Sequence, residues 1–198
     1  MGQTNYVRGF RVSTQRSMLE RPLVWKRPRR VFVNSMSDLF HEKVPRRYIE
    51  EVFAVMNRAT WHQFLVLTKR PERLLEIDSR LVWTSNIWMG VSIENSEVIA
   101  RLEQLRRCHA ANKFLSLEPL LGPLPELDLR GVNWVIVGGE SGPKSRRMEP
   151  EWVIEIRDIC AASKVPFFFK QWGGVQKKAT GRVLDGRTWD ACPVSARV

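Results

Sequence analysis

Six short apolar runs divide the chain and predict the strands of a buried sheet. They occupy residues 30–34, 64–68, 87–93, 113–117, 133–137 and 166–170. The runs lack the strict alternation of apolar and polar residues that marks a half-exposed sheet, and they are rich in β-branched and aromatic residues. Such runs are typical of parallel strands that are covered on both faces.

Helical patterns separate several of these runs. Residues 48–56, 98–105 and 152–160 each carry an apolar stripe at helical spacing. Pro150 suits a first helical position, and Asn95 or Ser96 could cap the middle helix. The connection after the second run predicts at most a short helix, and the connection after the fourth predicts none. Repeated strand-then-helix units build either an open doubly wound sheet or a closed barrel, and periodicity does not choose between them.

The 198 residues, 43% of them apolar, are enough for one packed domain. We expect a lead-in segment at residues 1–29, a βα-repeat body at 30–175 and a C-terminal hairpin or tail at 176–198. The hairpin is indicated by Asp185-Gly186, a pair that favours a tight turn between two short segments.

Polar residues follow each apolar run, where a parallel sheet presents its carboxyl edge. Ligands of parallel α/β folds and barrels bind at that edge, so we expect these residues to meet at one rim. The candidates for ligand binding, assigned by position alone, are Ser35, Asp38, Lys69, Glu94, Glu118, Glu140, Lys170 and Gln171. No catalytic residue is predicted.

The rim glutamates Glu94, Glu118 and Glu140 directly follow apolar runs, so desolvation would raise their pKa values unless a nearby lysine or arginine keeps them ionised. They could bind a cationic group or transfer protons; the alternative is a network of ion pairs that only completes the mouth of the barrel. Gly138 and Gly139 either admit a ligand or permit a tight turn. Neither the dinucleotide-binding glycine motif nor the P-loop motif is present.

The net charge of +11 and the isoelectric point near 10.2 favour partners rich in phosphate. Nucleic acid is therefore a candidate partner, and a merely solvated basic surface is the alternative. Among the tryptophans, Trp172 beside two glycines is the best candidate for stacking on a base, whereas the others are expected to pack in the core or at the rim.

Cys108, Cys160 and Cys192 are too far apart for a disulfide framework and suit a reducing compartment. Neither these cysteines nor the three histidines have the spacing of a metal site, so no metal is predicted. No apolar run reaches the length of a membrane span, and the first residues are not of signal-peptide type. We expect a cytoplasmic protein without a membrane partner.

Seven segments in order resemble successive blocks of the phage gene-product 37/68 family, a group of unknown specific function related to radical-SAM enzymes. They are VFVNSMSDLFHEKVP, FLVLTKRPERL, GVSIEN, SLEPLLGPL, VIVGGESGP, FFFKQWGG and GRVLDGRTWD. The similarity extends from about Tyr6 to Pro193. The resemblance implies an α/β fold, a partial (βα)6-type barrel of radical-SAM-like architecture, with S-adenosylmethionine and a [4Fe–4S] cluster at its carboxyl rim.

The chain departs from this family where the cluster would be bound. Members carry three closely spaced cysteines on a loop after a further strand, and we expect this chain to lack both that first strand and the cysteine loop. No cluster ligand can be transferred to Cys108, Cys160 or Cys192. We therefore expect no cofactor for this chain as written, and whether it is an enzyme stays uncertain. A truncated gene, a misplaced start codon and a cluster-free relative are all compatible with the sequence.

Three functions remain as expectations. The first is a radical-SAM-like domain whose rim binds a small or nucleotide-containing molecule; with the upstream cysteines restored it would cleave S-adenosylmethionine reductively and abstract hydrogen. The second is a non-catalytic module that binds nucleic acid. The third is a subunit that needs a protein partner over the open edge of its sheet.

Overall fold

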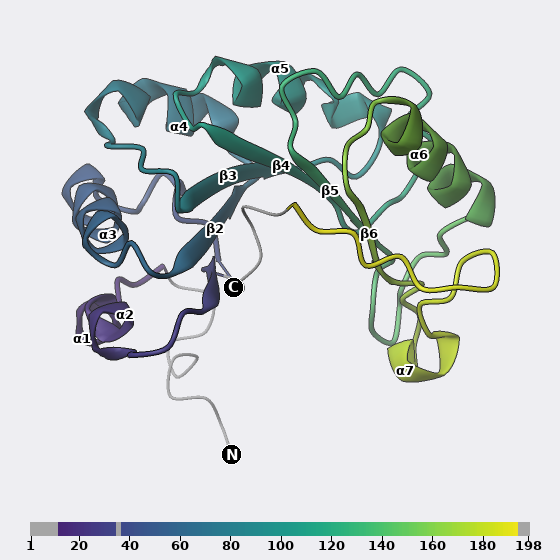
Figure 1. Ribbon diagram of the computed structural model, residues 1–198, viewed down its shortest axis with the longest axis horizontal. Helices are drawn as coiled ribbons and strands as arrows, with labels where there is room; N and C mark the ends of the chain where they lie inside the picture. The colour runs from purple at the N-terminus through teal and green to yellow at the C-terminus, as the bar shows by residue number, and fades with distance from the viewer. Residues whose placement is uncertain (1–11, 35–36, 194–198) are drawn as a thin grey trace.

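Six parallel strands form one sheet that curls into a half-barrel, with helices on its convex side (Figure 1). The computed structural model describes residues 12–34 and 37–193. Each strand pairs with the next one in sequence, so the spatial order is β1-β2-β3-β4-β5-β6. This sequential order belongs to a barrel-like sheet and not to a doubly wound one. The prediction of a partial barrel is therefore confirmed.

All six predicted runs form strands, and no strand end differs from the prediction by more than one residue. The strands are β1 Arg30–Val33, β2 Gln63–Thr68, β3 Ile87–Ser92, β4 Asn112–Leu117, β5 Trp134–Gly138 and β6 Phe167–Gln171.

The three predicted helical stripes are also confirmed, as α3 Arg46–Arg58, α5 Ala100–Arg107 and α6 Pro150–Ala162. Pro150 is the first residue of α6, and Asn95 caps a short 3-10 helix, η3 Ser96–Val98, directly before α5. The remaining helices are short: α1 Arg16–Leu19, α2 Arg21–Val24, α4 Pro71–Ile77, η2 Asp78–Arg80 and α7 Lys177–Thr180. None of the helices in the described part of the chain combines the length and the apolar character that crossing a bilayer requires.

The convex face of the sheet carries the larger hydrophobic core. Alternate strand residues such as Val66, Met89 and Val135 point to this side and are fully buried. The helices cover them with side chains that include Phe53 of α3 and Ile156 of α6. Burying side chains of this size contributes about 1.5 to 3 kcal/mol each, which makes this layer the main source of stability.

The concave face carries a second, smaller core that is largely aromatic. It consists of Leu65, Trp88, Phe114, Trp134 and Ile136. The rings of Trp88 and Trp134 meet edge to face with centroids 6.4 Å apart. Gly90 makes room for this layer, because a Cβ atom at that position would lie 2.5 Å from the Cζ atom of Phe114.

The segment after residue 180 contains the predicted tight turn. Asp185 and Gly186 both have positive φ, and Leu184 and Arg187 exchange backbone hydrogen bonds across them. The arms form only this one bridge, because the second arm then runs along β6, where the Phe169 N–H donates to the Trp189 carbonyl at 2.9 Å.

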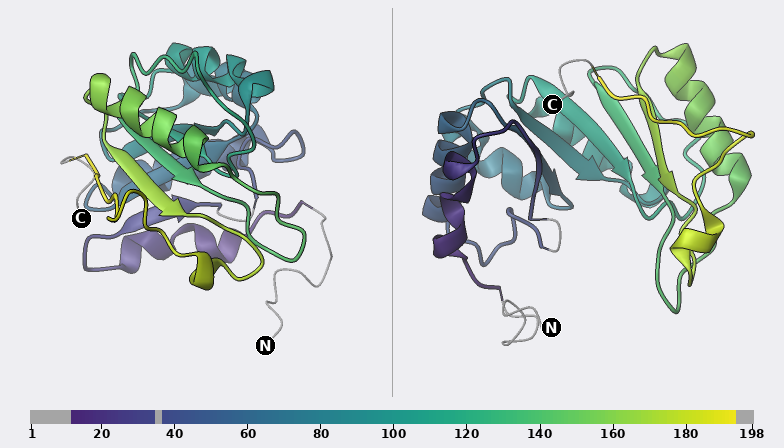
Figure 2. Two further views of the ribbon diagram at one scale, coloured as in Figure 1. Left: turned by 90° about the vertical axis from the view of Figure 1, so that its right-hand side faces the viewer. Right: turned by 60° about the horizontal axis from the view of Figure 1, so that its bottom comes forward.

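This C-terminal segment then crosses the amino ends of the strands (Figure 2). The Trp134 indole donates to the Ala191 carbonyl at 3.0 Å, and the Arg30 guanidinium donates to the Cys192 sulfur at 3.1 Å. The segment thereby links β5 to β1 and covers the concave face at the amino ends of the strands. The opposite, carboxyl end of the concave face is where the predicted rim lies.

Candidate functional site

Two serines lie above the aromatic floor of the concave face. Ser92 of β3 pairs with Ser116 of β4; Ser92 follows Trp88 by four positions and Ser116 follows Phe114 by two, so both point to the side of the floor. Their residues are only 2% and 5% exposed. The buried Trp88 Nε1 has no hydrogen-bond partner within residues 12–34 and 37–193. An unpartnered buried polar group is costly, so this face is suited to a ligand or to water that accepts a hydrogen bond from the Trp88 indole.

Glu94 and Lys69 form the first ion pair of the rim. The Lys69 ammonium contacts the Glu94 carboxylate, and Arg101 donates to the same carboxylate at 2.8 Å and to the Ser92 carbonyl at 2.8 Å. Burial raises the pKa of Glu94, but the hydrogen bond from Lys69 and the charges of Lys69 and Arg101 outweigh it, so the pKa lies below its ordinary value. Glu94 is therefore ionised at neutral pH.

Glu118 and Lys170 form the second pair and join the ends of β4 and β6. The Lys170 ammonium lies 2.9 Å from both carboxylate oxygens, and the Gln171 amide donates to one of them at 3.2 Å. Gln171 also donates to the Ser141 hydroxyl at 3.2 Å. The side chain of Lys170 is 49% exposed and that of Glu118 is 23% exposed. A solute that reaches the rim therefore meets a cation and a carboxylate side by side.

Asp38 holds the loop after β1 against the end of β2. Its carboxylate accepts hydrogen bonds from the Thr68 hydroxyl at 2.8 Å, from the Lys69 N–H at 3.0 Å and from the Phe40 N–H at 2.9 Å. The Arg70 guanidinium lies 3.3 Å away. These contacts occupy the carboxylate, so its main role in this structure is to fix the loop.

Glu140 is held in the same way by a local partner. The Arg146 side chain donates to both carboxylate oxygens at 2.9 Å, and the Arg146 N–H donates to one of them at 2.9 Å. These hydrogen bonds lower the pKa of Glu140 to about 2. The neighbouring Gly139 is required by a close backbone approach, because a Cβ atom there would lie 1.9 Å from the Trp172 carbonyl oxygen.

The structure thus brings together four of the predicted rim residues as two clusters on the concave side, Lys69 with Glu94, and Glu118 with Lys170, while Gln171 braces the second. Ser35 lies outside the described residues.

Trp172 packs edge to face on Phe169 at 4.8 Å and donates to the Val183 carbonyl, so it serves packing. Sequence reasoning missed Ser92, Ser116, Arg101 and Arg146; the serines could have been found as polar residues inside two apolar runs.

The cysteines do not come together as cluster ligands. Cys108 ends α5, Cys160 lies within α6 and Cys192 lies in the C-terminal segment. Burial raises the pKa of the Cys108 thiol and raises that of Cys160 to about 12, which disfavours the thiolates that iron requires. Within the described ranges no three His, Cys, Asp or Glu side chains are grouped to hold a metal ion. A [4Fe–4S] cluster does not fit these residues.

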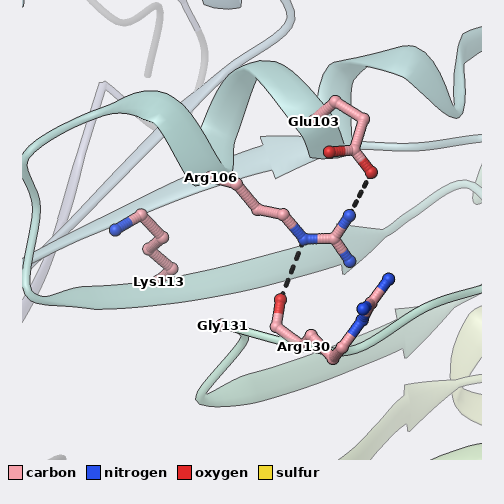
Figure 3. A pocket seen from close by; sticks show the side chains of 5 residues that line it. All are labelled: Glu103, Arg106, Lys113, Arg130 and Gly131. Atoms are coloured by element: carbon pink, nitrogen blue, oxygen red, sulfur yellow. Dashed lines mark hydrogen bonds and ion pairs between the residues drawn. The ribbon is translucent and has the colours of Figure 1, made fainter.

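A hollow of about 400 Å³ lies at the other end of the sheet, near the amino ends of β4 and β5 (Figure 3). It is lined by Glu103, Arg106, Lys113, Arg130 and Gly131. Arg106 is turned toward the carboxylate of Glu103 and donates to the carbonyl of Arg130 at 2.9 Å. The hollow belongs to a different face from the rim.

The family model described as "Protein of unknown function (DUF5131)" matches residues 1–193. The chain belongs to the DUF5131 family. No curated protein and no solved structure matches it. The match covers nearly the whole DUF5131 chain, and the family description assigns no activity. The relation to phage proteins and to radical-SAM enzymes therefore stays a prediction.

Proposed function

We propose that the DUF5131 domain is a radical-SAM-like, phage-related half-barrel that binds a nucleotide-containing small molecule at its carboxyl rim. S-adenosylmethionine is the first candidate. The observation that carries the proposal is the buried Trp88 indole without a described partner, together with the buried residues Ser92 and Ser116, directly beneath two ion pairs. A molecule with hydroxyl, ammonium and carboxylate groups would form hydrogen bonds with these polar side chains and ion pairs with these charged ones.

The chemistry of the rim suits such a molecule. The Glu118 carboxylate would take an ammonium group, and the Lys170 ammonium beside it would take a carboxylate. The serine hydroxyls would hydrogen-bond sugar hydroxyls. Bound S-adenosylmethionine would supply a sulfonium-activated group, and the residues of this chain would hold and orient it.

The proposal is a binding role and not a cluster-dependent reaction. The buried thiols of Cys108 and Cys160 have raised pKa values and lie apart, one directly after the end of α5 and the other within α6. Anaerobic reconstitution with iron and sulfide should therefore leave the purified chain without a four-iron cluster. A stoichiometric cluster, detected by iron analysis and its absorption, would contradict this part.

Calorimetric titration of S-adenosylmethionine and of adenosine into the purified chain tests the binding role. We expect saturable binding that weakens by about tenfold in Glu118→Gln, since losing one charge-assisted hydrogen bond costs about 1.5 kcal/mol or more. The matched control is Glu151→Gln, which removes the same charge from an exposed position in the first turn of α6. Absence of heat with both compounds, or equal losses in the two variants, would overturn the proposal.

A further inference from the structure

A set of cations at the amino end of the half-barrel makes no ion pair with any described residue. It consists of Lys26, Arg27, Arg29, Arg58, Arg80, Arg107 and Lys164, all of them exposed. We call this set the amino face. Each member lies directly before a strand, or at or just after the end of a helix, and in a parallel βα fold these positions are on one side.

Two carboxylates near this end, Asp78 and Asp128, are already occupied. Asp78 is buried and accepts from the Trp83 indole at 2.9 Å and from His109. Asp128 pairs with Arg106 at 3.1 Å and with Arg130. The charge of the amino face is therefore not neutralised by its surroundings, and it produces a positive potential that attracts polyanions.

The helix dipole explains only part of this set. Arg58 and Arg107 end α3 and α5, where a positive charge is favoured by the carbonyl ends of the helix. Lys26, Arg27 and Arg29 lie outside any helix, in the five residues between α2 and β1. Their position requires another explanation.

The basic segment between α2 and β1 is fixed to the end of the sheet. The buried His62 accepts from the Arg29 N–H at its Nδ1 atom, 3.1 Å away, so its Nε2 atom carries the proton that is donated to the Pro22 carbonyl at 2.9 Å. The Trp61 indole donates to the Trp25 carbonyl at 2.8 Å. These contacts hold the segment in place before any partner binds, which lowers the entropy cost of binding.

Aromatic surface accompanies these charges. Trp61 remains 41% exposed, and the Arg29 guanidinium lies over the Trp25 ring at 4.8 Å. Exposed tryptophan beside unpaired cations is the combination that binds single-stranded nucleic acid, with phosphates on the cations and a base on the ring. A duplex would use the charges but would leave the ring without a base.

The hollow of Figure 3 extends the amino face toward β4 and β5. It adds the Lys113 ammonium, whereas Arg106 and Arg130 are largely neutralised by Glu103 and Asp128. It therefore continues the basic surface without being a closed site of its own.

We propose that the amino face binds single-stranded nucleic acid, with its phosphates on Lys26, Arg27, Arg29 and the neighbouring cations and a base stacked on Trp61. The proposal is independent of the small-molecule function of the rim, because it uses the opposite end of the strands. Either could fail without the other.

Fluorescence anisotropy of a labelled 20-nucleotide oligothymidylate, measured from 50 to 300 mM salt, tests the proposal. The amino-face variant carries Lys26→Gln, Arg27→Gln and Arg29→Gln. For single strands the slope of log affinity against log salt changes by about 0.7 per phosphate contact, so we expect the slope to fall by about 2 and the affinity at 0.1 M salt to fall roughly 100-fold.

The matched control carries Lys43→Gln, Arg46→Gln and Lys144→Gln. These three cations are exposed, lie toward the carboxyl end and make no ion pair with a described residue. The control loses the same net charge, and we expect it to bind as the unchanged chain does, within about threefold, since its lost cations contact no phosphate.

Trp61→Leu separates the stacking contact from the charges. We expect it to weaken binding of the oligothymidylate at least about fivefold with an unchanged salt slope, and to leave binding of a duplex of equal length unchanged. Circular dichroism establishes that each variant is folded.

Equal losses in the amino-face variant and its control would overturn the proposal. So would binding of duplex at least as tight as of single strand together with no effect of Trp61→Leu. Binding of anionic lipid vesicles without binding of either nucleic acid would also reject it, and would assign the surface to a membrane instead.

Discussion

Several cations at the carboxyl rim are paired with carboxylates, whereas the cations of the amino face pair with no described carboxylate. At the carboxyl rim, Lys69, Lys170 and Arg146 each contact a carboxylate. At the amino face, cations such as Arg27 and Lys164 make no ion pair with a described residue. Both ends carry cations from strand–helix junctions, so the difference lies in where the acidic residues are.

This difference separates two kinds of binding. A rim whose charges are paired with one another would suit a small molecule that carries both signs, and its buried serines would favour groups that form hydrogen bonds. A face of unpaired cations favours a long polyanion and binds it with a strong dependence on salt.

Loss of the rim carboxylate with the most partners should have the largest effect on stability. Asp38→Ala leaves the Thr68 hydroxyl and the Lys69 N–H without their acceptor. We expect the free energy of unfolding to fall by about 2 to 4 kcal/mol, measured by urea denaturation. Asp38→Asn keeps one oxygen acceptor and should cost about half as much; equal costs would contradict the assigned contacts.

Glu94→Gln should have a smaller effect that depends on pH. The pKa of Glu94 is lowered in the folded chain, so its contribution to stability is complete above its ordinary value of 4.5 and is lost as the pH falls through the folded value. We expect a loss of about 1 to 2 kcal/mol at pH 7 that shrinks below pH 4.5. A loss that is the same at pH 7 and pH 3 would mean that packing and not charge is responsible.

Single changes at the amino face should have the smallest effect on stability. Arg27→Gln and Arg107→Gln break no ion pair with a described residue. We expect each to alter the free energy of unfolding by less than about 0.5 kcal/mol in the same urea experiment. A loss as large as that of Glu94→Gln would show that these cations make stabilising contacts within the chain, and it would contradict the difference drawn between the two ends.

The strands could be predicted because parallel strands covered on both faces have continuous apolar runs, from residues 30–34 to 166–170. Periodicity did not predict that the sheet curls into a half-barrel, because curling depends on pairing between strands; that prediction came from the family resemblance. The rim residues were found from their positions after strands. Arg101, the partner of Glu94, lies on α5, and Arg146, the partner of Glu140, lies six residues further along the same connection. Both contacts depend on backbone geometry, so they required the structure.

The amino face was only partly foreseen. The run Lys26-Arg27-Pro28-Arg29-Arg30 is plain in the sequence, but Arg58, Arg107 and Lys164 join it only through the fold. The expectation that a protein partner covers the open edge of β1 stays a prediction. Phe32 of that strand is 42% exposed.

The most direct test of two separate sites is calorimetric titration of S-adenosylmethionine into the free chain and into the chain saturated with oligothymidylate. We predict saturable binding with the same affinity in both titrations, because the rim and the amino face lie at opposite ends of the strands. Loss of binding in the saturated chain would place both ligands on one surface and contradict the account. Absence of binding in both titrations would show that the rim does not bind S-adenosylmethionine.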